Sequence, residues 1–220
     1  MKITYEEIKK NETINTYIKQ ADENLKALGF TEHSFAHVGK VACDTGFILS
    51  ELDYDEETIE LAKIAGYMHD IGNVVNRIDH AQSGAVMAFR ILDKIGADDE
   101  DIAKIVAAIG NHDESTAYPV NPIAAALIIA DKSDVRESRV RATADIKADI
   151  HDRVNYAVKE QKLEVDKANK TVTLSLLVDT DICQVMDYFQ IFLGRMNLCK
   201  TAAEKLEVKF KLVINNQIMV

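Results

Sequence analysis

Histidines and aspartates lie in five short segments of this sequence, each at or near the end of an apolar stretch. The segments read FAHVGKVA, YMHDIG, IDHAQSGA, AIGNHDE and LIIADKSD. Imidazole and carboxylate groups together suit zinc, iron, manganese and similar divalent ions. Side chains from separate helices can meet inside a helical bundle, so wide spacing in the sequence is compatible with one site. The segments indicate a candidate metal centre, and the alternative is a set of unrelated core and surface residues.

The second segment contains the adjacent pair His69 and Asp70, followed closely by Gly72. Neighbouring residues on a helix point about 100° apart, so these two side chains cannot share one helical face. Either both converge on one ion at a helix end, or each has a separate partner.

Helices are the elements that must position these residues. Apolar positions recur with helical spacing through residues 1–150, acidic residues precede several of the runs, and Pro122 fits the first turn of the last one. The predicted helices cover one or two segments within residues 3–28, and then residues 35–50, 55–68, 80–95, 97–112 and 121–140.

After residue 150 the pattern changes to alternating and β-branched residues. Residues 154–166 and 170–179 predict a hairpin, residues 181–204 a helix, and residues 208–214 a third strand. The predicted fold is therefore mainly α, with a helical domain over residues 1–150 and a small α+β (ββαβ) appendage over residues 151–220. The appendage would serve as a dimerisation element, giving a homodimer by strand pairing, or as a lid.

Composition limits the function classes. The chain has 220 residues, a formal net charge of −10 and 47% hydrophobic residues. Such an acidic protein offers no overall positive field for nucleic acids or anionic membranes, although a local basic patch can still hold a small phosphorylated ligand. Its three cysteines are widely spaced, the N-terminus lacks an apolar signal core, and no apolar run approaches the roughly 20 residues that span a bilayer. We expect a cytoplasmic protein that binds neither nucleic acid nor membrane.

The order His37, His69–Asp70, His80, His112, Asp131 resembles that of the HD-domain superfamily of metal-dependent phosphohydrolases. HVGKVA looks like the first motif of that superfamily, HDIG like its namesake doublet, and ADKSD like its last aspartate motif. The resemblance covers roughly residues 30–140 and not the appendage.

The resemblance implies a ligand set and a reaction. His37, His69, Asp70 and Asp131 would bind one ion, and His80 and His112 would add a second, with Asp70 bridging the two. His80 and His112 could instead be capping or surface histidines, which would leave a single ion. Fe, Mn, Zn, Ni and Mg are the candidate metals, at one or two ions per chain. His69 and Asp70 would be the catalytic residues.

The implied activity is hydrolysis of a phosphate ester or anhydride, on a nucleotide or another small phosphorylated substrate, by a metal-activated water. Two alternatives stay open. Some proteins that resemble this superfamily use the same ligands in a di-iron oxygenase centre. A non-catalytic sensor or assembly module would keep the metal as a structural staple.

Substrate-binding candidates flank the ligands. His33 lies four residues before His37 and could contact a phosphate, or be a surface histidine. Lys132, Arg136 and Arg139 have the spacing of one helical face and would form a phosphate clamp, or a solvated face. Asn73 departs from the superfamily, because many members have a lysine there that touches substrate. Asp113, beside His112, would orient a ligand, act as a general acid or merely end a helix. His151 and the cysteines are expected to be structural.

Overall fold

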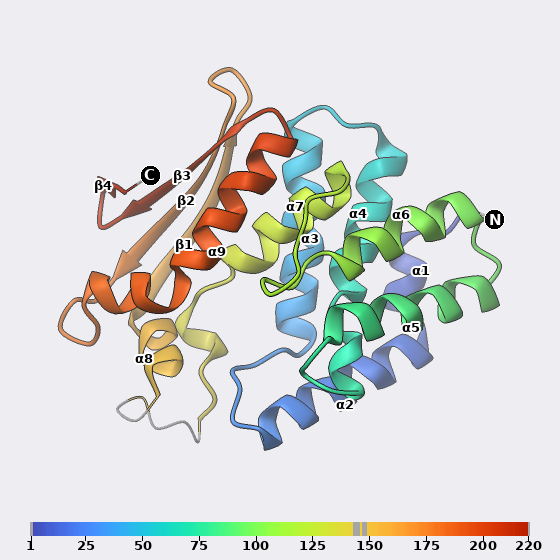
Figure 1. The fold of residues 1–220 in the computed structure, drawn as a ribbon, viewed down its shortest axis with the longest axis horizontal. Helices are drawn as coiled ribbons and strands as arrows, with labels where there is room; N and C mark the ends of the chain where they lie inside the picture. The colour runs from blue at the N-terminus through green and yellow to red at the C-terminus, as the bar shows by residue number, and fades with distance from the viewer. Residues whose placement is uncertain (1, 143–145, 147–148, 220) are drawn as a thin grey trace.

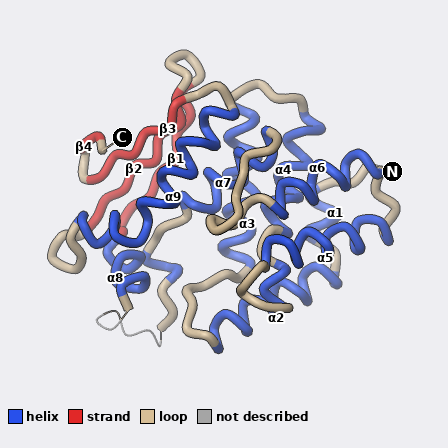
Figure 2. Tube along the Cα trace, in the orientation of Figure 1, coloured by secondary structure: helices blue, strands red, loops and turns tan. Residues whose placement is uncertain are grey.

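The computed structural model describes residues 2–142, 146 and 149–219. Helices make up the larger part of the molecule, and all of the described strands gather in one small sheet at its side (Figure 1, Figure 2). None of the described helices is both long and apolar enough to cross a membrane. The mainly helical fold class with a C-terminal α+β appendage is thus confirmed.

The helical part follows the predicted order, and several helices begin at side-chain caps such as Ser34, Asp55 and Asn121. Its elements, with η denoting a 3₁₀ turn, are α1 Tyr5–Lys9, α2 Glu12–Ala27, α3 Phe35–Glu51, α4 Glu56–Met68, η1 Ile71–Val74, α5 His80–Lys94, α6 Asp99–Gly110, α7 Pro122–Ser133, η2 Glu137–Arg139 and α8 Ile150–Ala157.

The helix predicted over residues 121–140 ends early. α7 stops at Ser133, Asp134 has left helical geometry with ψ 73°, and Arg136 is extended with φ −162°. The buried carboxylate of Asp134 accepts hydrogen bonds from a histidine of α3 and from Arg136, and these contacts require the chain to turn inward. The prediction that Lys132, Arg136 and Arg139 share one helical face is therefore wrong.

The appendage forms a four-stranded sheet of order β1-β2-β3-β4. Its elements are β1 Val158–Asp166, β2 Thr171–Val178, α9 Val185–Lys205, β3 Lys209–Ile214 and β4 Gln217–Ile218. β1 and β2 pair antiparallel, while α9 provides the crossover that lets β3 pair parallel to β2. The predicted ββαβ order is present with a two-residue β4 added, and the first strand begins later than expected because residues 154–157 belong to α8.

The core packs the helices that carry the histidine and aspartate segments against one another. α7 is buried from Ile123 to Ala130, as expected for a helix that is apolar on every side, and it contacts α3, α4, α6 and α9. A Cβ at Gly66 would lie 2.8 Å from the Cα of Ala42, and one at Gly72 would lie 1.9 Å from the carbonyl oxygen of His80. Glycine at these two positions therefore allows the close approach of α4 to α3 and of η1 to α5.

Candidate metal centre

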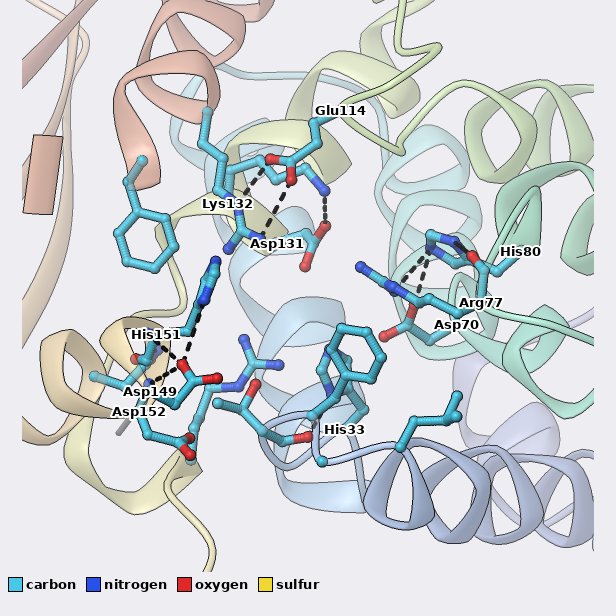
Figure 3. A pocket seen from close by; sticks show the side chains of 18 residues that line it. His33, Asp70, Arg77, His80, Glu114, Asp131, Lys132, Asp149, His151 and Asp152 are labelled. Atoms are coloured by element: carbon cyan, nitrogen blue, oxygen red, sulfur yellow. Dashed lines mark hydrogen bonds and ion pairs between the residues drawn. The ribbon is translucent and has the colours of Figure 1, made fainter. Parts of the chain in front are cut away.

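Six histidine and aspartate side chains converge from five helix ends. His37 lies in the first turn of α3, His69 caps α4 and is followed by Asp70, and His80 begins α5. His112 follows α6, and Asp131 lies in the last turn of α7. All but Asp131 are less than a tenth exposed. Figure 3 shows Asp70, His80 and Asp131 around one cavity. The expected ligand residues are thus brought together.

Each of the four histidines uses its Nδ1–H as a hydrogen-bond donor to the protein. The acceptors are Asp134 Oδ2 for His37 (2.7 Å), Gly66 O for His69 (2.8 Å), Arg77 O for His80 (3.1 Å) and Ile109 O for His112 (2.6 Å). A neutral imidazole that donates from one nitrogen keeps a lone pair on the other, and this second hydrogen bond fixes the ring. All four Nε2 atoms can therefore serve as ligands, that of His37 once a metal has displaced its proton.

The carboxylate of Asp70 lies between two pairs of these nitrogens. Oδ2 is 3.6 Å from Nε2 of His37 and 3.2 Å from Nε2 of His69. Oδ1 is 3.4 Å from Nε2 of His80 and 4.0 Å from Nε2 of His112. One oxygen thus faces each pair, which is the arrangement of a carboxylate able to contact two ions.

Asp131 lies beside the pair formed by His37 and His69. Its Oδ1 lies 3.5 Å from Nε2 of His37 and 3.7 Å from Nε2 of His69, while its Oδ2 accepts a 2.7 Å hydrogen bond from Nζ of Lys132. Asp131 therefore offers one oxygen to the cluster and gives the other to Lys132.

The donor set fits a divalent ion. Nε2 of His37 and Nε2 of His69 are buried without any hydrogen-bond partner, a costly state for a polar atom unless a ligand satisfies it. Within each of three overlapping groups, the candidate ligand atoms lie within 4.8 Å of one another. Atoms about 2.0–2.2 Å from a shared ion lie roughly 3.0–3.5 Å apart, close to the spacing found here. These side chains can therefore hold a divalent metal.

The electrostatics of the cluster favour a cation. Burial opposes the ionisation of Asp70 and Asp131, but neighbouring imidazoles, joined at Asp131 by Lys132, hold the pKa of both carboxyl groups well below the usual range. Burial lowers the pKa of His112 to about 3. Burial and Arg139 also oppose protonation of His37, yet the surrounding carboxylates raise its pKa to about 10. Before a metal binds, the site thus contains ionised carboxylates that draw positive charge to it.

Two supporting residues were not identified from the sequence. Asp134 is fully buried, accepts from Nδ1 of His37 and also pairs with Arg136 Nε at 2.7 Å. Asn73 donates from Nδ2 to both the carbonyl oxygen and Oδ1 of Asp70, at 3.0 Å each. Asn73 therefore orients the candidate bridging carboxylate instead of facing a substrate. The position of Asp134 in ADKSD, three residues after Asp131, was the available signal for its role.

The Asp134→Asn variant is expected to bind metal about 10- to 100-fold more weakly than the wild type, the usual effect of losing a ligand's supporting partner. The amide weakens the acceptor for Nδ1–H of His37 without leaving a void. Competition with a chromogenic chelator measures the affinity. Asp44→Asn is a matched control, because Asp44 lies on α3 and pairs with Lys40. Equal affinities for the two variants would contradict the role of Asp134.

The four residues expected to bind substrate do not all line the same cavity. His33 precedes α3, yet its ring centroid lies 5.3 Å from that of His37, and its Nδ1–H donates to Thr31 O. Burial and Arg139 hold the pKa of His33 well below its usual value, so this ring is neutral. Lys132 and Arg139 line the same cavity as His33. Arg136 instead borders a separate hollow near Lys40.

Arg139 is committed to the protein: its guanidinium donates to Glu32 O and Asp134 O. Asp113 is held as a carboxylate, because its hydrogen bond from Ser115 and its proximity to His80 outweigh burial and lower its pKa. It is therefore not poised as a general acid near neutral pH.

The cavity beside the cluster has a volume of about 400 Å³ and is bounded by three parts of the chain. The loop over residues 28–33 forms one side, and the histidine and aspartate cluster forms another. The third side comes from α8, which contributes Asn155, and from the appendage, where Phe192 and Arg195 of α9 line the cavity. Nε of Arg195 pairs with Oε2 of Glu114 at 2.7 Å across this boundary. The appendage is thus a wall of the candidate site, and its role as a lid or dimerisation element stays a prediction.

Comparison with known proteins agrees with the arrangement of the cluster. The family model of the HD domain matches residues 34–139. This segment is an HD domain. It contains all six members of the cluster, whereas most of the loop over residues 28–33 and the whole appendage lie outside the match. The HD domain thus contains the candidate metal ligands, and other parts of the chain supply most of the remaining cavity wall.

Relatives of the HD domain here are distant. An uncharacterized protein of Methanocaldococcus jannaschii is 27% identical over 112 residues, which is 43% of this chain and 42% of that protein. The chain therefore spans less than half the length of this curated relative. The crystal structure of a predicted HD superfamily hydrolase from an uncultured Thermotogales bacterium is 25% identical, with a TM-score of 0.45, over 56% of this chain and 67% of the other.

Proposed function

We propose that this chain is a metal-dependent phosphohydrolase that acts on a nucleotide or another small phosphate ester or anhydride. His37, His69 and Asp131 would hold one ion, His80 and His112 a second, and Asp70 would contact both. The observation that carries the proposal is the division of the Asp70 carboxylate, with one oxygen toward each pair of histidines. A cytoplasmic location and a homodimer stay predictions.

The residues of the chain supply binding and orientation. Divalent ions, when bound, would lower the pKa of a coordinated water and offset charge on a phosphoryl oxygen. Asn73 holds the Asp70 carboxylate in place, and Asp134 holds the ring of His37. Lys132 Nζ lies at the cavity wall, 2.7 Å from Asp131, where it can donate to a substrate oxygen. His33, which is neutral, can accept a hydrogen bond through Nε2.

The same six side chains suit a di-iron oxygenase, and the ligand set alone does not separate the two chemistries. A cationic guanidinium at the cavity edge, that of Arg77, favours an anionic phosphoryl group over a purely oxidative role. The two activities differ in co-substrate, because hydrolysis consumes water and oxygenation consumes dioxygen.

The test is metal analysis of the purified chain followed by an activity screen. Plasma mass spectrometry should find one or two divalent ions per chain. Phosphate release should then be measured without oxygen, over nucleotides and simple phosphate esters, with Mn, Fe, Ni, Mg and Zn. Oxygen consumption without phosphate release would replace this proposal by the oxygenase. A stoichiometric metal with neither activity would favour the non-catalytic module.

A further inference from the structure

Arg77 is a cation at the edge of the candidate metal centre that the sequence analysis did not identify. It lies between η1 and α5, and its guanidinium lies 5.4 Å from the ring centroid of Phe30. Its Nη1 is 3.4 Å from Asn73 Oδ1 and 3.5 Å from Nε2 of His80. Figure 3 shows it beside Asp70 and His80 at the cavity wall. The cation therefore faces the half of the cluster formed by His80 and Asp70 Oδ1.

The hydrogen-bonding capacity of Arg77 is largely unused. Within the described part of the chain it forms no ion pair, and its Nε and Nη2 have no hydrogen-bond acceptor. The other cations of the cavity each pair with oxygens of the protein: Lys132 with Asp131, Arg139 with Glu32 O and Asp134 O, and Arg195 with Glu114. Among the described residues, Arg77 thus differs from these neighbours in having no carboxylate partner, so its charge is left for a ligand.

We propose that Arg77 binds the phosphoryl group of the substrate beside His80 and Asp70, and that the substrate carries one phosphoryl group. This inference rests on the proposed function. A planar guanidinium can donate two parallel hydrogen bonds to a phosphate, and the cation–π contact with Phe30 helps to hold it at the cavity edge. Asn73 carries no charge and uses its amide to orient Asp70, so Arg77 is the cation nearest to His80 on this side of the cluster.

The rest of the cavity argues against a second phosphoryl group. Its outer wall includes the carboxylates of Asp149 and Asp152. No lysine or arginine among the described residues forms an ion pair with either one; the partner of Asp149 is His151, at 3.4 Å. A diphosphate extending from the metal centre toward α8 would meet this negative charge without a compensating cation.

Binding of inorganic phosphate tests the role of Arg77. The Mn²⁺-loaded wild type, Arg77→Met and Arg90→Met are titrated by calorimetry, and the metal content of each is measured. We expect phosphate to bind Arg77→Met about ten- to hundredfold more weakly, the range for losing a charge-assisted hydrogen bond, with metal content unchanged. Arg90→Met is the matched control, because Arg90 lies on α5, is 76% exposed and pairs with Asp93. It should bind phosphate as the wild type does, and Arg77→Lys should recover part of the affinity.

Full phosphate affinity in metal-loaded Arg77→Met, or no phosphate binding by the metal-loaded wild type, would overturn the inference. If the wild type bound phosphate through Arg77 but bound no metal, the proposed function would be wrong. The role of Arg77 in binding an anion would still hold. A second titration uses imidodiphosphate, a non-hydrolysable diphosphate. It should bind the wild type no more tightly than phosphate does, and binding about tenfold tighter or more would overturn the single-phosphoryl selectivity.

Discussion

Replacement of Asp70 by alanine is expected to abolish dinuclear metal binding and hydrolysis together. Both oxygens of this carboxylate lie among the histidine nitrogens, so one substitution removes a ligand atom from each half of the cluster. It also removes the one negative charge that lies within 4.0 Å of Nε2 of each of the four histidines. Since bound ions contribute several kcal/mol to stabilising the developing charge in phosphoryl transfer, the rate of phosphate release should fall by about a thousandfold or more. Metal content and phosphate release, measured on the same preparation, check this result.

The control for Asp70→Ala is Asp113→Ala. Asp113 is also a carboxylate near the cluster, but its closest approach is 3.9 Å, to Nε2 of His80 alone. The Asp113→Ala variant should keep its metal content. Thermal unfolding of both metal-free variants guards against a folding defect. Full activity in Asp70→Ala would refute the mechanism.

Replacement of His112 by alanine should leave one ion per chain. His112 belongs to the half of the cluster that also contains His80, and its Nε2 lies 4.0 Å from Asp70 Oδ1. The other half keeps His37, His69 and Asp131. We expect activity to fall by about a hundredfold or more, because the charge that a second ion would supply to the phosphoryl oxygens is lost. Metal stoichiometry by plasma mass spectrometry is the decisive measurement.

His151→Ala is the matched control for His112→Ala. His151 lines the same cavity, but its side chain is 56% exposed and it is not part of the candidate ligand groups among the described residues. It should keep the metal content of the wild type. Two ions retained in His112→Ala would remove His112 from the site. One ion in the wild type itself would mean a mononuclear centre.

The histidine and aspartate cluster was accessible from the sequence because its members end strongly periodic helices. The helix ends at His69, His80 and His112 follow from apolar periodicity and nearby glycines, and local periodicity is what a sequence displays most directly. The end of α7 was missed for the opposite reason. Residues 134–140 keep a helical spacing of charged residues, and the contact that draws Asp134 inward is to His37, 97 positions earlier in the chain.

The contacts of Asn73 and Arg77 also depend on tertiary structure that the sequence does not display. Asn73 stood out as a departure from a motif, but its hydrogen bonds to Asp70 depend on how η1 folds after α4. Nothing in the sequence marked Arg77 as a candidate site residue, because an isolated arginine in a loop is ordinarily solvated. Its proximity to Phe30 joins segments far apart in the chain.

The sequence by itself determined the mainly helical class, the ββαβ order of the appendage and the set of candidate metal-ligating side chains. These depend on residue type and local periodicity. Only the tertiary structure decided which oxygen of Asp70 faces which histidines, that the appendage walls the cavity, and that Arg77 has no carboxylate partner among the described residues while Arg139 has one. The physical reason is that each of these depends on distances between side chains that the packing of helices, and not their spacing along the chain, brings within a few ångströms.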